Sequence, residues 1–302
     1  MKKALITGGT GFVGQHITQL LLEKGYSVAI LTRNPRPNST NMSYYKWDLE
    51  QRYIDENAVL KADIIINLAG ENIADKRWTN QRKAAILESR ILPIQLICDV
   101  LKKHNKKLDV FISASAVGIY GNKSSDEICT EDSSFGTDFL ANVCRKWENE
   151  VAIISNLGIR TALIRTGLVL GNDGFLAKIK SLFNYKLGAV LGSGKQYMPW
   201  VYIDDLVRMY LFAIENEKVS GSYNAAIDDK MTNAIFSKAL AKLYGYSIWL
   251  PNVPGFILKL LLGEMSTIIL NGNRISSAKI EKEGFVFNYP NLDAALQNGI
   301  KK

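Results

Sequence analysis

The sequence predicts an α/β protein with a doubly wound parallel sheet, followed by a smaller, mostly helical C-terminal substrate lobe. Short apolar runs alternate with amphipathic segments along the first part of the chain, which is the pattern of parallel strands joined by helices. A glycine-rich turn links the first apolar run to the first amphipathic segment. Beyond about Gly171 the alternation ends, so we divide the chain into residues 1–171 and 172–302 and expect that later segments could rejoin the sheet.

The glycine-rich turn lies within Lys3–Leu22, which reads KALITGGTGFVGQHITQLLL. Gly8 suits a tight turn, Gly11 lets the backbone approach a phosphate, and Gly14 lets a helix and a strand pack closely. The helix N-terminus adds free N–H groups and a positive dipole end. The stretch therefore predicts a dinucleotide-binding Rossmann domain, and the alternative is the same turn without a ligand. The remaining turn residues expected at this site are Thr10, Phe12 and Val13.

The end of the second predicted strand, Ser27–Thr32, indicates which dinucleotide is bound. An acidic residue at this point would accept hydrogen bonds from the ribose 2′-hydroxyl and repel a 2′-phosphate. The chain has Thr32 and Arg33 here and no acid, which favours a 2′-phosphate. We therefore predict NADP rather than NAD, the alternative being a solvated arginine at a strand end.

The other predicted elements follow from apolar runs, helix caps and turn residues. Thr79 or Asn80 could cap a long helix that continues to about Lys103, with Pro93 as a potential kink. The further strands are expected at 42–47, 62–68, 110–113 and 160–166, and the further helices at 138–157, 204–216, 232–244 and 254–262.

Composition narrows the class of protein. The net charge is +8, but the Lys and Arg residues are dispersed, so we expect no nucleic-acid partner and favour an anionic small-molecule ligand. No apolar run reaches the roughly 18 residues of a membrane-spanning helix, so we expect no membrane partner. The three cysteines form no C-x-x-C pair and there are two histidines, which predicts a reducing, cytoplasmic location and no metal site. The oligomeric state stays open.

Several motifs together resemble a known family. They are TGGTGFVG, the Asp48–Leu49 pair, NLAG, a serine-rich strand end that leads to Tyr120–Gly121, and WVYIDD. The chain resembles the extended short-chain dehydrogenases/reductases, which include sugar-nucleotide epimerases. Runs such as NLAGENIADKRW, RTGLVLG, LGSGKQYMPWVYIDD and LLLGEMS more narrowly resemble an atypical epimerase-like branch whose C-terminal domain has no known function, and whose members are sometimes labelled cell-division inhibitors.

The resemblance implies NADP(H) on the glycine turn, with Thr32 and Arg33 at its 2′-phosphate. It implies that Arg90 reaches the cofactor from the long helix and that Leu168 lies beside the nicotinamide. It also implies that Asp204 and Asp205 cap the helix that follows them. The other positions that it assigns to the cofactor are Asp48, Leu49, Leu68, Ala69 and Gly70.

One departure from the family pattern leaves the activity open. Typical reductases of this class carry Tyr and Lys four residues apart on one helix face, where the lysine lowers the pKa of the tyrosine that moves the proton. None of the 13 tyrosines here has Lys at that spacing. Either Tyr120 is the acid of an epimerase-like oxidoreductase, with Ser113 or Ser115 orienting a small carbonyl or hydroxyl substrate, or the protein is an inactive NADP(H) sensor or scaffold. Tyr120 could equally be a packed turn residue.

Three further side chains have two interpretations. Trp78 and Trp200 could line a substrate pocket by stacking on a planar or sugar ligand, or could belong to the core. Cys144 lies on a predicted apolar helix stripe without a nearby base, so we interpret it as a buried core thiol rather than a nucleophile.

Overall fold

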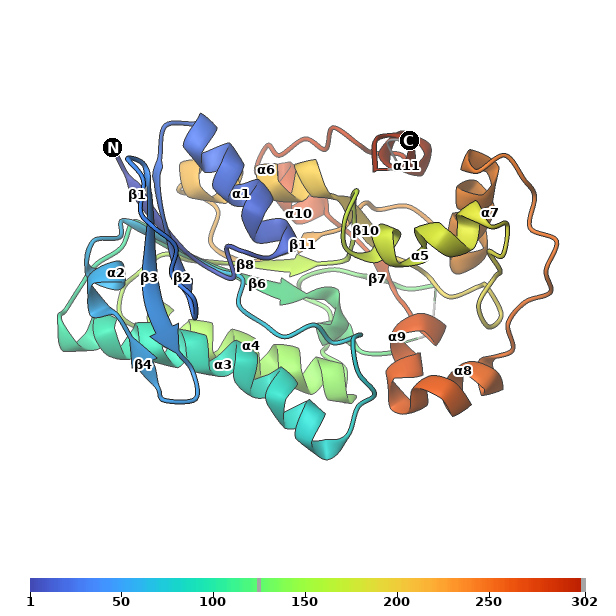
Figure 1. Cartoon of the computed structure of the whole chain (residues 1–302), viewed down its shortest axis with the longest axis horizontal. Coiled ribbons are helices and arrows are strands. Elements are labelled where there is room, and N and C mark those ends of the chain that lie inside the picture. Colours follow the sequence, from blue (N-terminus) through green and yellow to red (C-terminus); the bar gives the residue numbers. More distant parts are fainter. Residues whose placement is uncertain (124–125, 300–302) are drawn as a thin grey trace.

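The computed structural model describes residues 1–123 and 126–299. Eight strands form one sheet in the order β11-β8-β6-β5-β1-β2-β3-β4, and all neighbours are parallel except β3 and β4 (Figure 1). The predicted doubly wound α/β fold is therefore confirmed. The strands are β1 Lys3–Thr7, β2 Ser27–Thr32, β3 Met42–Asp48, β4 Tyr53–Ile54, β5 Ile64–Asn67, β6 Val110–Ala116, β8 Thr161–Thr166 and β11 Gly221–Ala225.

Helices cover both faces of the sheet. Successive strand residues point to opposite faces, so apolar strands need helices packed on both sides. Ala4 and Ile6 of β1 pack with α1 and α6, whereas Leu5 packs with α2, α3 and α4 on the other face. Each face thus has its own buried core. The bounds of these helices are α1 Phe12–Glu23, α2 Glu56–Leu60, α3 Asn80–Lys103, α4 Phe139–Ser155 and α6 Ile203–Glu215.

Most predicted elements occur close to their expected bounds. The second strand is found at Ser27–Thr32 as expected, and Thr79 caps α3 by accepting a hydrogen bond from the Arg82 N–H. The helix continues through Pro93. β6 runs to Ala116 rather than to Ser113, because its pairing with β8 continues through the alternating serines and alanines. Tertiary pairing, which local hydropathy does not contain, sets that strand end.

Most of the rest of the chain lies at the carboxyl end of the sheet, whereas residues 278–283 lie beside the start of β11, where Lys279 donates to the Ser222 oxygen and Asn216 to the Glu283 oxygen. Two short parallel pairs, β9 with β10 and β7 with β12, connect it to the core. Because β11 enters the main sheet, segments after residue 171 do rejoin it, and the division at that residue stays a prediction. Among the described residues no helix is long and apolar enough to cross a membrane. The elements are η1 Val117–Tyr120, β7 Ile128–Cys129, β9 Leu168–Leu170, α5 Phe175–Asn184, β10 Trp200–Tyr202, α7 Asn233–Leu243, α8 Gly255–Leu262, η2 Gly263–Ser266, α9 Thr267–Leu270, β12 Arg274–Ile275, α10 Ala278–Lys282 and α11 Leu292–Gly299.

The expectation that the aspartate pair caps α6 is wrong. The N-cap residue of α6 is Tyr202, and no side-chain cap bond is found there among the described residues. Asp205 is fully buried and accepts the backbone N–H groups of Asn288 and Tyr289, each at 2.8 Å. Its carboxylate also pairs with Arg208 at 2.7 Å. The side chain therefore anchors the C-terminal segment to α6 instead of capping the helix.

Removing this anchor should destabilise the protein. We expect Asp205→Ala to lower the free energy of unfolding by about 2–4 kcal/mol, because two buried amides lose their acceptor. Equilibrium unfolding in urea would measure this loss at an unchanged m-value. Asp205→Asn, which keeps one acceptor oxygen for these amides, should cost clearly less than Asp205→Ala. Equal losses for the two variants would contradict the anchoring role.

Candidate functional site

The glycine turn between β1 and α1 is shaped by close backbone approaches. Gly8 has φ +68°, and a Cβ on it would lie 2.9 Å from the carbonyl of Leu68. A Cβ on Gly14 would lie 2.3 Å from the Gly8 oxygen, so this position tolerates glycine alone. Gly11 is exposed, and the nearest atom to a Cβ there would be the Gly8 oxygen at 3.3 Å. The turn is therefore tight at Gly8 and Gly14 and open toward solvent at Gly11.

The N-terminus of α1 faces this opening. Gly11 is the N-cap residue, and within the described part of the chain no side chain caps the helix and no acidic residue stands in its first turn. The first N–H groups of a helix need an acceptor, and an anion supplies one together with the favourable dipole. Phe12 and Val13, both half-buried, begin the helix, and Thr10 is exposed beside it. The open N-terminus of α1 is thus suited to an anion.

Polar side chains at the carboxyl ends of three strands hold the turn in place. The Thr7 hydroxyl donates to Asn67 at 2.7 Å, and the Asn67 amide donates to the Ser113 hydroxyl at 3.1 Å. The Thr7 oxygen in turn accepts the N–H groups of Leu68 and Ala69, each at 3.1 Å. Ser113 is thus fully buried in a chain that spans β1, β5 and β6. These hydrogen bonds align the ends of β1, β5 and β6 and fix Leu68 and Ala69 next to Gly8.

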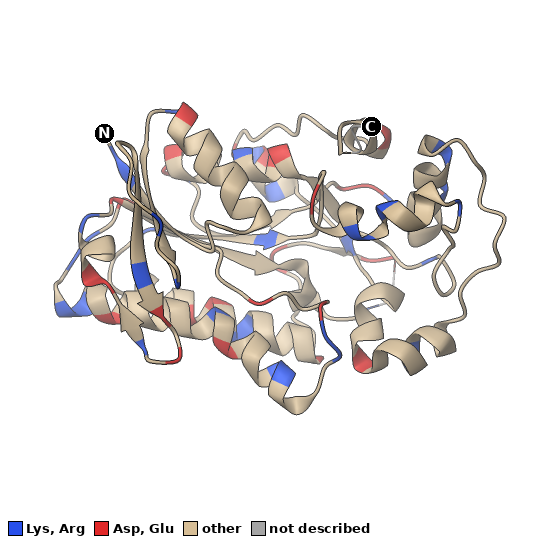
Figure 2. Cartoon of the chain, in the orientation of Figure 1, with Lys and Arg blue, Asp and Glu red and all other residues tan. Residues whose placement is uncertain are grey.

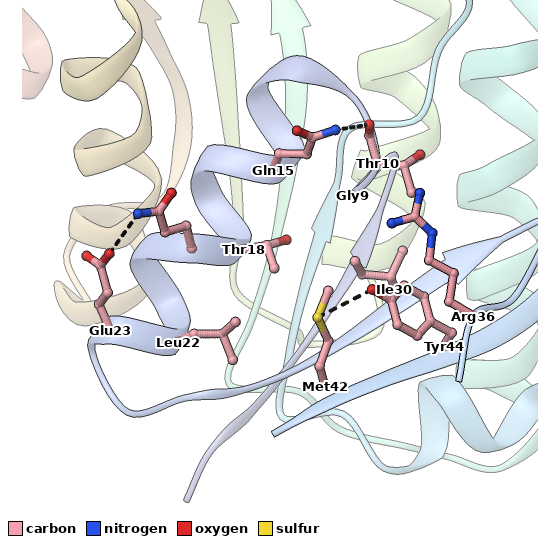
Figure 3. A pocket seen from close by; sticks show the side chains of 11 residues that line it. Gly9, Thr10, Gln15, Thr18, Leu22, Glu23, Ile30, Arg36, Met42 and Tyr44 are labelled. Carbon is pink, nitrogen blue, oxygen red and sulfur yellow. Dashed lines mark hydrogen bonds between the residues drawn. The ribbon is translucent and has the colours of Figure 1, made fainter. Parts of the chain in front are cut away.

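A cation that the sequence did not suggest lies beside the glycine turn. Arg33 is exposed at the end of β2, as predicted, and Arg36 lines a hollow of about 420 Å³ together with Gly9 and Thr10. Figure 3 shows the Arg36 side chain pointing toward Thr10. Neither arginine has a carboxylate partner in the residues the structure describes. Arg36 lies in an irregular loop, so no periodic signal could have selected it.

Two other predicted positions, Asp48 and Leu49, lie at the carboxyl end of β3. The Asp48 carboxylate accepts the N–H groups of Glu50 and Gln51 at 3.0 and 3.1 Å and so closes the turn after β3. Leu49 is half-buried and packs against the core between the sheet and α3. Both residues are therefore within a structured turn rather than free to move.

Arg90 is a half-buried cation on α3. Its guanidinium donates to the backbone oxygens of Ile86 and Glu71 and lies 5.3 Å from the centre of the Trp147 ring. Burial lowers the pKa of Arg90, and no carboxylate faces it within the described ranges. A Cβ on Gly70 would lie 3.2 Å from the guanidinium carbon, so the glycine is what admits Arg90 at the end of β5. A half-buried cation without a counter-charge favours a nearby anion.

Leu168 lies just beyond the carboxyl end of β8. It is the first residue of β9, is half-buried, and its N–H donates to the Pro199 oxygen at 2.7 Å. The hydrogen bond holds Leu168 against the segment that enters β10.

The candidate acid, Tyr120, is fully buried in a network of internal hydrogen bonds. Its hydroxyl donates to Asn224 at 2.7 Å and accepts from Arg165 at 3.0 Å. Arg165 makes a two-pronged ion pair with Glu148, at 2.9 and 2.8 Å. Burial raises the pKa of Tyr120 to about 12, against the opposing effect of Arg165. The phenol is thus protonated at neutral pH and both of its bonding directions are taken.

The other expected parts of a proton relay are also buried. Ser115 donates to Glu148 at 2.7 Å and is 3 % exposed. On α4, the positions that would carry the Tyr/Lys pair hold either Phe139 and Val143 or Leu140 and Cys144, and all four side chains pack into apolar clusters. Burial raises the pKa of the Cys144 thiol to about 12, so the interpretation as a core thiol agrees with its surroundings.

The two tryptophans belong to the core. Trp200 is fully buried and its indole N–H donates to Asp229 at 3.0 Å. Trp78 is 9 % exposed, donates to the Ile73 oxygen and packs edge-on against Phe139. Stacking of a ligand on Trp200 is therefore excluded by its burial.

Comparison with known proteins fits this geometry. The family model described as NAD dependent epimerase/dehydratase family matches residues 4–226, and a domain of unknown function, DUF1731, matches residues 253–298. Epimerase family protein YfhF of Bacillus subtilis (strain 168) is 38% identical over 293 residues, which are 96% of this chain and 95% of YfhF.

Two solved structures have the same fold. The human epimerase family protein SDR39U1 (isoform 2), solved with NADPH, is 27% identical with a TM-score of 0.87 over 98% of both chains. UDP-glucose 4-epimerase from Thermotoga maritima, solved with UDP-glucose, is 19% identical with a TM-score of 0.79 over 98% of this chain and 97% of its own. At that identity the second likeness shows the fold alone.

The doubly wound sheet with a glycine turn at its switch point defines a dinucleotide-binding α/β protein of the extended short-chain dehydrogenase/reductase type. The chain belongs to the NAD-dependent epimerase/dehydratase family. The match to DUF1731 also confirms the resemblance to the branch with a C-terminal domain of unknown function.

The two glycines of the turn should respond differently to an added methyl group. Gly14→Ala should lower the melting temperature by several degrees, because its Cβ cannot fit beside the Gly8 oxygen without moving the turn. Gly11→Ala should leave the melting temperature within about 2 °C and still weaken dinucleotide binding at least about tenfold, because its methyl group occupies the opening. Calorimetry would give both quantities, and Gly255→Ala, away from the turn and with its Cβ at an ordinary contact distance of 3.6 Å from Leu270, is the control.

Proposed function

We propose that the protein binds NADP(H) on the glycine turn and acts as an epimerase-like oxidoreductase on a small carbonyl or hydroxyl substrate. The observation that carries the proposal is the uncapped N-terminus of α1 with Arg36 in a hollow shared with Gly9 and Thr10, together with the exposed Arg33 at the end of β2. A pyrophosphate would satisfy the helix N–H groups and a 2′-phosphate would neutralise the arginines. The NADPH in the solved structure of the relative SDR39U1 supports this choice.

Residues on both sides of the switch point would line the dinucleotide. Gly8, Gly11 and Gly14 would shape the pyrophosphate site. Thr32 and Arg33 would face the 2′-phosphate, and Arg90 would offer its half-buried positive charge to the middle of the cofactor. The remaining positions proposed to contact it are Thr10, Phe12, Val13, Asp48, Leu49, Leu68, Ala69, Gly70 and Leu168.

A bound nicotinamide would supply hydride exchange with the substrate carbon. The protein itself would position the nicotinamide ring beside Leu168 and exclude water from it. In this proposal a proton would move through Tyr120, with Ser113 or Ser115 orienting the substrate oxygen. The burial of all three side chains counts against that route, because a catalytic acid must reach the atom that it protonates.

This burial favours a second candidate function, an inactive NADP(H) sensor or scaffold. Such a protein needs the dinucleotide site but no proton relay. Apolar residues at the relay positions of α4 fit it equally well. The two functions therefore share the cofactor and differ in whether a substrate oxidises it.

The cofactor preference can be tested at Arg33. We expect calorimetric titration to show tighter binding of NADPH than of NADH. Arg33→Ala should weaken NADPH binding about tenfold or more, by loss of charge-assisted hydrogen bonds, and leave NADH binding unchanged. Arg145→Ala, which removes an exposed arginine from α4, is the matched control.

Equal affinity for the two dinucleotides would retain the dinucleotide site and remove the role of Arg33. If neither bound, both proposed functions would fail.

The role of Tyr120 can be tested by removing its hydroxyl. Tyr120→Phe leaves Arg165 and Asn224 each without one buried partner, so we expect a loss of about 1–3 kcal/mol in urea unfolding with unchanged NADPH affinity. Tyr53→Phe, at an exposed tyrosine, should have no effect. Once a substrate is identified, full turnover by Tyr120→Phe would exclude this residue as the acid. Any substrate-dependent oxidation of NADPH would exclude the scaffold.

A further inference from the structure

One part of the molecule is rich in lysine. Residues 174–203 and 230–263, which we call the cationic lobe, contain α5, α7 and α8 and not one Asp or Glu, although Asp173, Asp204, Asp229 and Glu264 directly flank these ranges. Figure 2 shows blue positions and no red on α5 and α7. All lysines of the lobe are exposed, and only Lys178 is paired, with Asp75 from outside the lobe. These lysines are Lys178, Lys180, Lys186, Lys195, Lys230, Lys238, Lys242 and Lys259.

The same lobe exposes large apolar side chains. On α8, Phe256, Leu260 and Leu261 are 70%, 74% and 67% exposed, and their spacing places them on one side of the helix. Tyr185 and Trp249 are 73% and 66% exposed. Single exposed apolar residues are common, but a group of large ones marks a surface that binds something.

Backbone and side-chain bonds join these two sets of residues. The Trp249 indole donates to the Lys186 oxygen at 2.9 Å, and the Gly188 N–H donates to the Tyr246 hydroxyl at 3.2 Å. The Val253 N–H then donates to the Val190 oxygen at 2.8 Å, directly before α8 begins. Residues 246–254 therefore run along 186–190 and connect the aromatic side chains to α8. Figure 1 shows α5, α7 and α8 at the same end of the molecule.

We propose that the cationic lobe docks on the surface of an anionic lipid bilayer. Lysines gain from anionic headgroups, and exposed tryptophan, tyrosine, phenylalanine and leucine side chains partition into the headgroup boundary. The charge argues against a second copy as the occupant, because two lobes without acidic residues would repel each other. Aliphatic and aromatic side chains among lysines also fit a lipid interface better than an acidic protein surface.

This inference stands apart from the proposed function and departs from the expectation of no membrane partner. That expectation came from the absence of long apolar runs, which detects segments that span a bilayer. A peripheral contact needs only exposed side chains on a folded surface. The sequence pattern of α8 alone would equally fit a buried helix.

Flotation with lipid vesicles tests the proposal on the full chain. We expect binding to vesicles of 70% phosphatidylcholine and 30% phosphatidylglycerol, little binding to phosphatidylcholine alone, and weakening as salt rises. Leu260→Gln combined with Leu261→Gln should reduce binding at least about tenfold, and Lys186→Gln about fivefold. These side chains are exposed, so the fold should be unaffected, and Val286→Gln, at an exposed valine outside the lobe, is the control.

Tryptophan fluorescence provides a second readout. The other four tryptophans are at most 9% exposed, so quenching by brominated lipid would report on Trp249. We expect quenching with anionic vesicles that is abolished in Trp249→Phe.

Three results would overturn the proposal: no flotation with anionic vesicles at low salt, equal flotation with neutral vesicles, or full flotation of the Leu260/Leu261 variant. Self-association in sedimentation that this variant abolishes would instead assign the surface to a second copy of the chain.

Discussion

The buried ion pair between Arg165 and Glu148 is the interaction on which the carboxyl edge of the sheet depends. Their side chains are 3% and 10% exposed, and the pair joins the end of β8 to α4. Burial alone would lower the pKa of Arg165, but the hydrogen-bonded carboxylate of Glu148 raises it above its usual value. Loss of either partner would leave an uncompensated buried charge, which typically costs 3–5 kcal/mol. The pair is therefore a fixed point, and it positions the neighbouring hydroxyls of Tyr120 and Ser115 through hydrogen bonds.

That fixed point explains why this site differs from an ordinary reductase site. Arg165 donates a hydrogen bond to the Tyr120 hydroxyl, and the Ser115 hydroxyl donates one to Glu148. Both hydroxyls are therefore bonded within the protein rather than free to bond a substrate. The position of the usual lysine on α4 holds Val143 or Cys144, whereas the arginine of β8 supplies a buried positive charge at this edge. Polar groups on the substrate side are satisfied internally, whereas those at the glycine turn remain open. The chain has kept the features for holding a dinucleotide more clearly than those for moving a proton.

The C-terminal segment is built into the same network. Asn224 donates to the Ser276 oxygen at 3.0 Å, and the Asn273 amide donates to the Gly121 oxygen. Asp205 holds the backbone at Asn288 in addition. The region matched by DUF1731 therefore contacts the η1 turn, β11 and α6 directly, and its packing helps to bury Tyr120. A role for this segment separate from the cofactor domain would have to act through these contacts or through the exposed α8.

Local patterns in the sequence determined the parallel sheet, the glycine turn and the bounds of most helices, because hydrophobic periodicity and turn chemistry act over a few residues. They also indicated Arg33, which directly follows a strand. Only the tertiary structure decided that Tyr120 is buried, because its partner Asn224 is 104 residues away in the sequence. It likewise decided the position of Arg36 beside the turn and the anchoring role of Asp205. The charge of the cationic lobe can be read from the sequence, but its exposed apolar side chains cannot, since the pattern of a helix does not say whether a neighbour covers it.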